Sequence, residues 1–243
     1  MRDILKKELA KCPRGFGRDK LFDLLRENDL LIRRKRRYAV TTDSNHRFHK
    51  YVNELVKTDI DAPHKAWVSD ITYLNTRERF VYLSLITDVY SRKIVGWSLD
   101  VSLAVEGAMN ALRKAIRQCP DTKHLLHHSD KGVQYCCRAY TGMAEKKGIV
   151  MSMGEAGNCY DNAIAERING ILKGEYLLDT EFEDYDAALK AVEQAIYLYN
   201  NERPHWSLGL DRPAVVHERG SYRKGFAFKR WGGGSTRASQ PIF

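Results

Sequence analysis

The sequence contains no run of about 18 apolar residues, so no segment is long and apolar enough to cross a membrane as a helix. Its first residues, MRDILKKELAKCPRG, also lack the apolar stretch of a secretory signal. These absences exclude the membrane-spanning and secreted classes, and we expect the protein to stay in the cytoplasm, where it is made.

Cysteines are few and irregularly spaced. The five of them form no CxxC pair, which excludes a disulfide framework and a zinc ribbon. A zinc site that also used His127 and His128 is disfavoured, because the adjacent Cys136 and Cys137 do not easily supply tetrahedral geometry. Reduced thiols are therefore the expectation.

Acidic residues are scarce at both ends of the chain. Residues 1–40 hold 13 Lys and Arg against 6 Asp and Glu, and residues 218–243 hold 6 against 1, within a net charge of +9. The middle of the chain is therefore slightly acidic. Basic ends around such a body predict arms that hold a polyanion against a site made of carboxylates. Basic tails that serve only solubility are the alternative.

Changes in composition divide the chain into four regions. Residues 1–45 are a small basic helical region that resembles part of a helix-turn-helix, and residues 46–64 are a polar linker. Residues 65–216 hold the apolar core, and residues 217–243 are a flexible basic tail. The first region contains consecutive cations suited to contact a phosphate backbone, namely Arg33, Arg34, Lys35, Arg36 and Arg37.

The core reads as an α/β domain with a mixed five-stranded sheet flanked by helices. β-branched and aromatic residues predict three antiparallel strands and two later short strands, over 66–74, 79–91, 93–102, 125–129 and 148–152. Apolar residues at helical spacing predict helices over 18–28, 103–118, 139–147, 159–175 and 184–200.

Three acids fall at informative places in this order. Asp70 lies in the middle of the first strand, where burying an ionised group costs several kcal/mol unless it is paired or bound to a metal. Asp130 ends the fourth strand, and Glu166 lies on the helix predicted over 159–175. Converging carboxylates favour Mg²⁺ or Mn²⁺, and two such ions suit attack on a phosphodiester. Each acid alone is more often structural.

The helix over 159–175 has two faces. Its apolar stripe is expected to pack on the sheet, while Asn162, Glu166 and Lys173 share the opposite side. An acid and a cation about 10 Å apart on one side suit a metal together with a phosphate. Asp161 or Asn162 is placed to cap the helix, with support of the metals as the second reading for Asp161.

The chain resembles the second-frame (OrfB-type) catalytic subunit of insertion-sequence transposases of the IS-three family, whose core is related to retroviral integrases. The motifs that carry the resemblance are WVSDITYL, HHSDKGVQY, MSMGEAGNCYDNAIAERINGILKGE and YNNERPHWSLGLDRPAV. The resemblance implies a ribonuclease H-like fold and a site of Asp70, Asp130 and Glu166 that binds Mg²⁺ or Mn²⁺, two ions in all. Lys173 is then a contact to element-end DNA.

The same resemblance implies supporting roles around the site. His128 and Gln134 are expected to line it or to be structural, and Arg203 and His205 to contact DNA or to end the fold. The implied reaction is metal-dependent: water cleaves a phosphodiester at the element end, and the freed 3′-hydroxyl attacks a second phosphodiester. No covalent protein–DNA intermediate is expected.

The implied partners are element-end and target DNA, further copies of the chain assembled on DNA, and the helix-turn-helix product of an upstream frame, free or fused. The protein is then nucleoid-associated in a bacterial cytoplasm. Two other readings stay open: a catalytically silent DNA-binding remnant that represses its element, and a related metal-dependent nuclease.

Overall fold

The computed structural model describes residues 18–28, 46–154 and 162–220, which belong to two compact units, Met1–Ala39 and Val40–Phe243. In the first unit, α2 (Arg18–Glu27) confirms the helix predicted over 18–28. The five consecutive cations at 33–37 lie outside the described residues.

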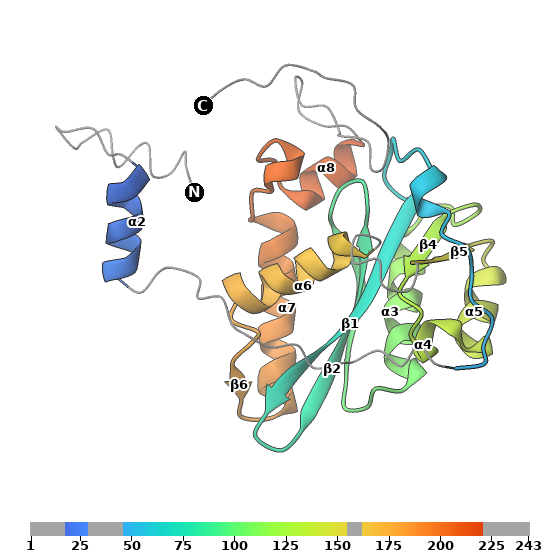
Figure 1. The fold of residues 1–243 in the computed structure, drawn as a ribbon, viewed down its shortest axis with the longest axis horizontal. Coiled ribbons are helices and arrows are strands. Elements are labelled where there is room, and N and C mark those ends of the chain that lie inside the picture. Colours follow the sequence, from blue (N-terminus) through green and yellow to red (C-terminus); the bar gives the residue numbers. More distant parts are fainter. Residues whose placement is uncertain (1–17, 29–45, 155–161, 221–243) are drawn as a thin grey trace. The chain divides into compact units, whose positions relative to one another are not determined.

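One mixed sheet organises the second unit (Figure 1). The strands are β1 (Ala66–Thr76), β2 (Phe80–Asp88), β3 (Ile94–Asp100), β4 (Leu126–Ser129) and β5 (Val150–Met153), in the order β3-β2-β1-β4-β5. β1 pairs antiparallel with β2 and parallel with β4. The predicted five-stranded mixed sheet is therefore confirmed. A further strand, β6 (Glu181–Phe182), pairs with the end of β1 and is too short to predict.

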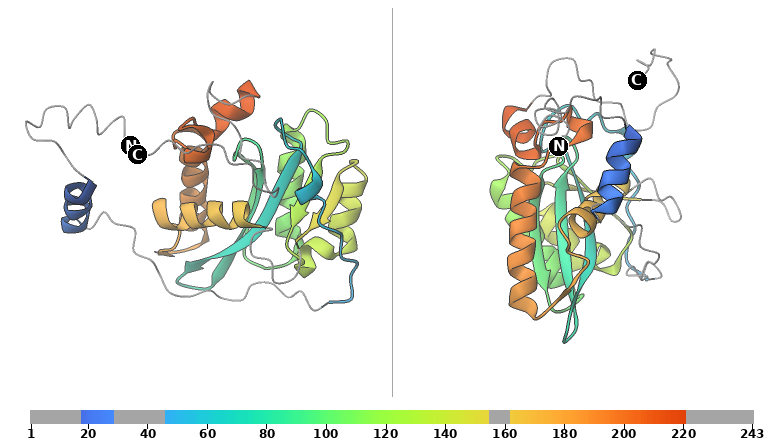
Figure 2. Two further views of the ribbon diagram at one scale, coloured as in Figure 1. Left: turned by 45° about the horizontal axis from the view of Figure 1, so that its top comes forward. Right: turned by 90° about the vertical axis from the view of Figure 1, so that its left-hand side faces the viewer.

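Helices pack on both faces of this sheet (Figures 1 and 2). On one face lie α3 (Val105–Gln118), α4 (Val133–Cys136) and α5 (Arg138–Glu145), and on the other α6 (Ala163–Glu175), α7 (Tyr185–Asn201) and α8 (Pro213–Arg219). Single turns of 3-10 helix occupy Leu55–Lys57 and Trp206–Leu208. No helix of the described residues is long and apolar enough to span a membrane.

The helix predicted over 159–175 begins later than expected. α6 starts at Ala163, and residues 155–161 lie outside the described part of the chain. Asn162 occupies the N-cap position, but its side chain makes no capping hydrogen bond, so the capping prediction was wrong for this residue. α4 and α8 are too short to show a periodic pattern and were not predicted.

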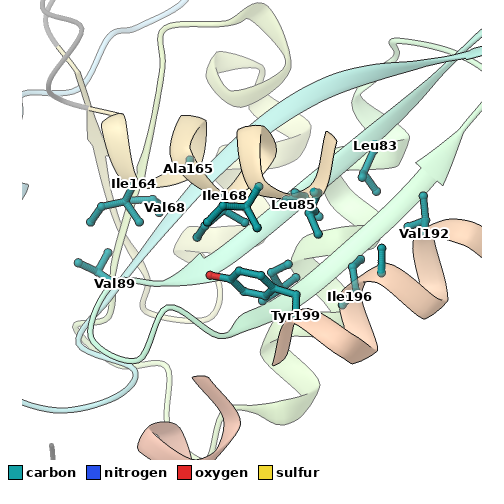
Figure 3. Close-up of a cluster of buried hydrophobic side chains, with 14 of the residues drawn as sticks. Val68, Leu83, Leu85, Val89, Ile164, Ala165, Ile168, Val192, Ile196 and Tyr199 are labelled. Carbon is teal, nitrogen blue, oxygen red and sulfur yellow. The ribbon is translucent and has the colours of Figure 1, made fainter. Parts of the chain in front are cut away.

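Side-chain alternation along β1 divides the core in two. Val68 packs with α6 and α7, whereas its neighbour Trp67 packs with α3 and α5 on the opposite face. Figure 3 shows the first cluster, in which Ile164 and Ile168 of α6 lie over the strands beside Tyr199 of α7. The apolar stripe of α6 thus fixes this helix above β1, as its sequence predicted.

Candidate active site

The pairing of β1 with β4 sets the position of the two aspartates. Val68 pairs with His128 in parallel register, and Asp70 and Asp130 each lie two residues further along the chain, Asp70 within β1 and Asp130 directly after β4. The backbones therefore bring the two carboxylates to neighbouring positions where β4 ends. Since side chains alternate along a strand, Asp70 points to the same face as Val68, which is the face that α6 covers.

Asp70 is held by hydrogen bonds at both of its oxygens. Asn169 of α6 donates to Oδ2 at 2.7 Å, and the backbone N–H of Ile71 donates to Oδ1 at 2.9 Å. Burial and the negative charges of Asp130 and Glu166 nevertheless raise the pKa of Asp70 to about 7, against the effect of these hydrogen bonds. The neighbouring acids therefore make it unfavourable for Asp70 to ionise in the protein alone, and a bound cation would favour its ionised form.

Glu166 reaches the aspartates from α6. Ile164 and Ile168, which flank it in the sequence, are buried against the sheet, and its charge acts on Asp70. Asp70 thus lies within range of the charges of both other predicted acids. Within the described residues, however, no three His, Cys, Asp or Glu side chains stand close enough together to hold a metal ion as placed. Three hard carboxylate donors fit Mg²⁺ or Mn²⁺ chemically, provided that their side chains turn toward a common ion.

Lys173 lies on the same side of α6, near the aspartates. Its Nζ sits 4.3 Å from the centre of the Tyr73 ring, in a cation–π contact. Burial lowers the pKa of Lys173, while the charges of Asp179 and Asp70 oppose the change. The helical spacing from Glu166 therefore does place a cation within range of the charge of Asp70.

Two asparagines join α6 to β1, and sequence reasoning assigned neither contact. Asn169 is buried and bonds Asp70, as described above. Asn162 donates from Nδ2 to the backbone oxygen of Ser69 at 3.3 Å, next to Asp70. A signal for Asn169 was present, because it follows Glu166 by three residues and so lies on a neighbouring part of the helix surface.

The other supporting residues expected around the site are buried. His128 is fully buried, and its Nδ1 lies 2.9 Å from Ser152 Oγ. Gln134 donates from Nε2 to the backbone oxygen of Leu103 at 3.0 Å. Both side chains thus join separate elements, His128 β4 to β5 and Gln134 α4 to the loop before α3. Asp161 lies outside the described residues.

Arg203 and His205 lie beyond α7 and have partners within the protein. Arg203 forms two hydrogen bonds of 2.7 Å with the carboxylate of Glu175, at the end of α6. His205 Nδ1 lies 3.0 Å from Ser207 Oγ, and burial with the charge of Arg203 lowers the pKa of His205 to about 4. The structure thus gives both residues a structural contact, whether or not they also touch DNA.

Sequence comparisons identify relatives over most of the chain. Residues 61–159 and 147–213 match two families that are both described as "Integrase core domain". An uncharacterized 31 kDa protein of insertion element IS600 from Shigella sonnei is 38% identical over 217 residues, which cover 88% of this chain and 80% of the relative. The transposase of insertion sequence IS629, also from Shigella sonnei, is 36% identical over 65% of this chain and 53% of its own length.

Solved structures share the fold. A chain of the simian T-cell lymphotropic virus intasome matches with a TM-score of 0.58 and 16% identity over 82% of this chain and 67% of that chain. The HTLV-2 integrase catalytic core domain matches with a TM-score of 0.52 and 19% identity over 64% of this chain and 97% of that chain. The protein thus has the ribonuclease H-like fold of integrase cores. Together with the sequence matches, this assigns the chain to the family of insertion-element transposases with an integrase core domain.

Proposed function

We propose that this chain is a DNA transposase that cleaves phosphodiesters at the ends of its element and joins the freed strands to target DNA. The observation that carries the proposal is the meeting of Asp70 and Asp130 at the end of β4 beneath Glu166 of α6, in a chain of this family. Acids that repel one another in a partly buried site are costly to a fold and are useful where cations are bound.

Asp70, Asp130 and Glu166 are proposed to hold the divalent ions, Mg²⁺ or Mn²⁺, and the HTLV-2 core was solved with magnesium. Such ions, when bound, activate a nucleophilic oxygen and stabilise the leaving oxygen. The residues of the chain then have distinct tasks. Asn169 orients the carboxylate of Asp70, and Lys173 is placed to contact a DNA phosphate beside it. No side chain is needed as a covalent nucleophile, because water and then the 3′-hydroxyl attack.

The proposed substrate also implies partners and a place of action. The chain is expected to act on element ends and target DNA as an assembly of several copies, at the nucleoid of a bacterial cytoplasm. An upstream helix-turn-helix product is proposed as a further partner, and the cations at 33–37, Arg203 and His205 stay candidates for DNA contact. A silent DNA-binding remnant is not favoured, because such a chain would have no need of two further acids whose charges act on Asp70.

The test is a strand-transfer assay with a labelled duplex that carries the terminal repeat of the encoding element. We expect Mg²⁺-dependent nicking at the end and joining to a second DNA by the wild-type chain, and loss of both by Asp130→Asn and Glu166→Gln. Nicking without joining would instead identify a nuclease. Wild-type joining by either variant would show that the assigned acids are wrong.

A further inference from the structure

The segment that precedes β1 is tied to the core along its length. It runs beside α5 and β5, where Figures 1 and 2 show it in blue to cyan. Leu55 and Ile60 of this segment are buried. Three hydrogen bonds add to this packing: His46 Nε2 with Lys131 O at 2.8 Å, Tyr51 Oη to Glu145 Oε1 at 2.9 Å, and Glu54 N to Ser152 Oγ at 2.9 Å.

These contacts hold the first part of the segment, residues 46–51 or HRFHKY, beside the candidate active site. We call these six residues the basic–aromatic strap. Lys131, whose backbone oxygen contacts His46 of the strap, directly follows Asp130 in the chain. A second connection confirms the neighbourhood, because the charges of Asp130, Lys50 and Lys131 all act on the thiol of Cys136, whose pKa is raised to about 11, mainly by burial.

The strap presents cations and an aromatic ring to solvent. Arg47, His49 and Lys50 are exposed, and Phe48 is 42% exposed. Neither Arg47 nor Lys50 forms an ion pair with another described residue. The rings contact one another in pairs: His46 and Phe48 are tilted with their centroids 5.4 Å apart, and His49 and Tyr51 meet edge to face at 4.8 Å.

Alternating cations and aromatic rings suit a flexible nucleic-acid strand, because the cations follow its phosphates and the rings stack on unpaired bases. An ordinary solvated linker would not need the ties to Lys131 and Glu145, nor an exposed phenyl ring next to them. The middle of the chain is slightly acidic overall, so the cations of the strap stand out from the residues around them.

We propose that the basic–aromatic strap binds the strand of substrate DNA that enters the active site. Arg47 and Lys50 contact its phosphates, and Phe48 stacks on an unpaired base close to the reacting phosphodiester. The inference rests on the proposed function, since it names how the substrate of that same site is held. It also explains why this segment is fastened next to Asp130.

DNA binding by the full chain in EDTA tests the proposal without any reaction. The probes are a labelled single strand of about 20 nucleotides and the blunt duplex of the same sequence. We expect Arg47→Ala/Lys50→Ala to weaken binding of both probes about tenfold and to reduce the dependence of log affinity on log salt by about one to two. Phe48→Ala should weaken single-strand binding about tenfold and duplex binding much less, because only an unpaired base can stack.

Arg113→Ala/Lys190→Ala is the matched control, since it removes one Arg and one Lys from exposed positions on α3 and α7. It should leave binding of the single strand unchanged within about twofold. Equal effects of the strap and control variants on both probes would overturn the proposal. Thermal unfolding of each variant shows whether it is folded, and Arg47→Lys/Lys50→Arg, which keeps both charges, should restore binding.

The position of the strand is tested with a photocrosslinking amino acid in place of Phe48. Crosslinks should fall on the nucleotides at the 3′ end of an end-sequence duplex, and crosslinks spread evenly along the duplex would contradict the assigned place. These measurements do not depend on catalysis. If the wild-type chain neither cuts nor joins DNA, the proposed function fails, whereas normal joining with unaltered binding by the strap variants rejects the strap alone.

Discussion

Two aspartates show how neighbouring groups decide what a carboxylate does. Asp70 lies beside Asp130, and burial with this charge raises its pKa to about 7. Asp88 is fully buried, yet His217, whose Nδ1 lies 3.8 Å away, and hydrogen bonds from Ser91 and the His64 backbone outweigh its burial and lower its pKa. The first carboxylate is thus destabilising when ionised, whereas the second stabilises the turn after β2.

This contrast predicts opposite effects of the same substitution. Without metal at pH 8, Asp70→Asn should stabilise the fold by about 1–2 kcal/mol, because it removes a charge that the folded state disfavours. The gain should be less than half as large at pH 5, where the folded chain already holds Asp70 protonated but the unfolded chain still ionises it, and should vanish as pH falls below about 4. Urea unfolding of the wild type and the variant at pH 8 and pH 5 measures the difference in free energy of unfolding at each pH. Asp88→Asn is the control and should destabilise at either pH; a loss of stability in Asp70→Asn at pH 8 would contradict the assigned environment.

Asn169 is predicted to act through Asp70. Removing its 2.7 Å hydrogen bond in Asn169→Ala should leave Asp70 less well oriented and harder to ionise. Strand transfer should fall about 10- to 100-fold, the range found for residues that orient metal ligands, and half-maximal activity should need more Mg²⁺. Asn201→Ala removes an exposed amide that bonds only the Tyr197 backbone and should leave both quantities unchanged. An unaltered Mg²⁺ requirement in Asn169→Ala would rule out the positioning role.

At the scale of elements, α6 must keep a fixed place above β1, because it carries Glu166 and Asn169. Its apolar face anchors the helix in the core, and its C-terminal end is joined to the chain after α7 by the Glu175–Arg203 pair. The side chains of this pair are 30% and 17% exposed, so water screens it less than a surface pair.

The Glu175–Arg203 pair should therefore contribute measurably to stability. A double-mutant cycle with Glu175→Gln and Arg203→Gln is expected to give a coupling energy of about 1–3 kcal/mol. The exposed Arg77–Glu183 pair, at 3.8 Å, serves as the comparison and should give about 0–0.5 kcal/mol. A charge-exchange variant, Glu175→Arg with Arg203→Glu, separates the structural role of Arg203 from a contact with DNA. It should recover part of the stability that either single substitution loses. If its DNA affinity nevertheless stays below that of the wild type, Arg203 also contacts DNA.

For the whole molecule, titration of buried histidines and of Asp70 acts in opposite directions. Burial and the charge of His128 lower the pKa of His127 to about 3, and burial with Arg203 lowers that of His205 to about 4. Below pH 6.5 the unfolded chain binds these protons first, so the stability that the neutral histidines contribute is lost as pH falls. Asp70, whose folded pKa is raised, instead adds stability as pH falls from about 7 toward 4.

The histidine contribution is predicted to dominate in acid. Between pH 6.5 and 4.5 the free energy of unfolding should fall by about 2 kcal/mol for each buried histidine, partly offset by Asp70. Urea unfolding across this range measures the slope, which His205→Gln should reduce and the exposed His124→Gln should not. A slope unchanged by His205→Gln would show that this histidine is already charged in the folded state.

The sequence by itself determined the fold class and singled out the three acids as candidates. The alternation of β-branched residues marks β1 to β3, helical spacing marks α3 and α6, and Asp70 stands out because an ionised group in an apolar strand needs a partner. These signals are local, so they can be read along the chain. Short elements such as α4, α8 and β6 carry too few residues for a periodic pattern and are stabilised by packing.

Only the tertiary structure decided what lies around those acids. The Asn169–Asp70 bond and the Glu175–Arg203 pair join residues that no spacing rule connects, and the tie from His46 to Lys131 turns a stretch read as linker into a neighbour of the site. Such contacts depend on the register of β1 with β4 and on the position at which α6 packs against the sheet. They are set by the packing of distant segments, which composition and periodicity do not encode.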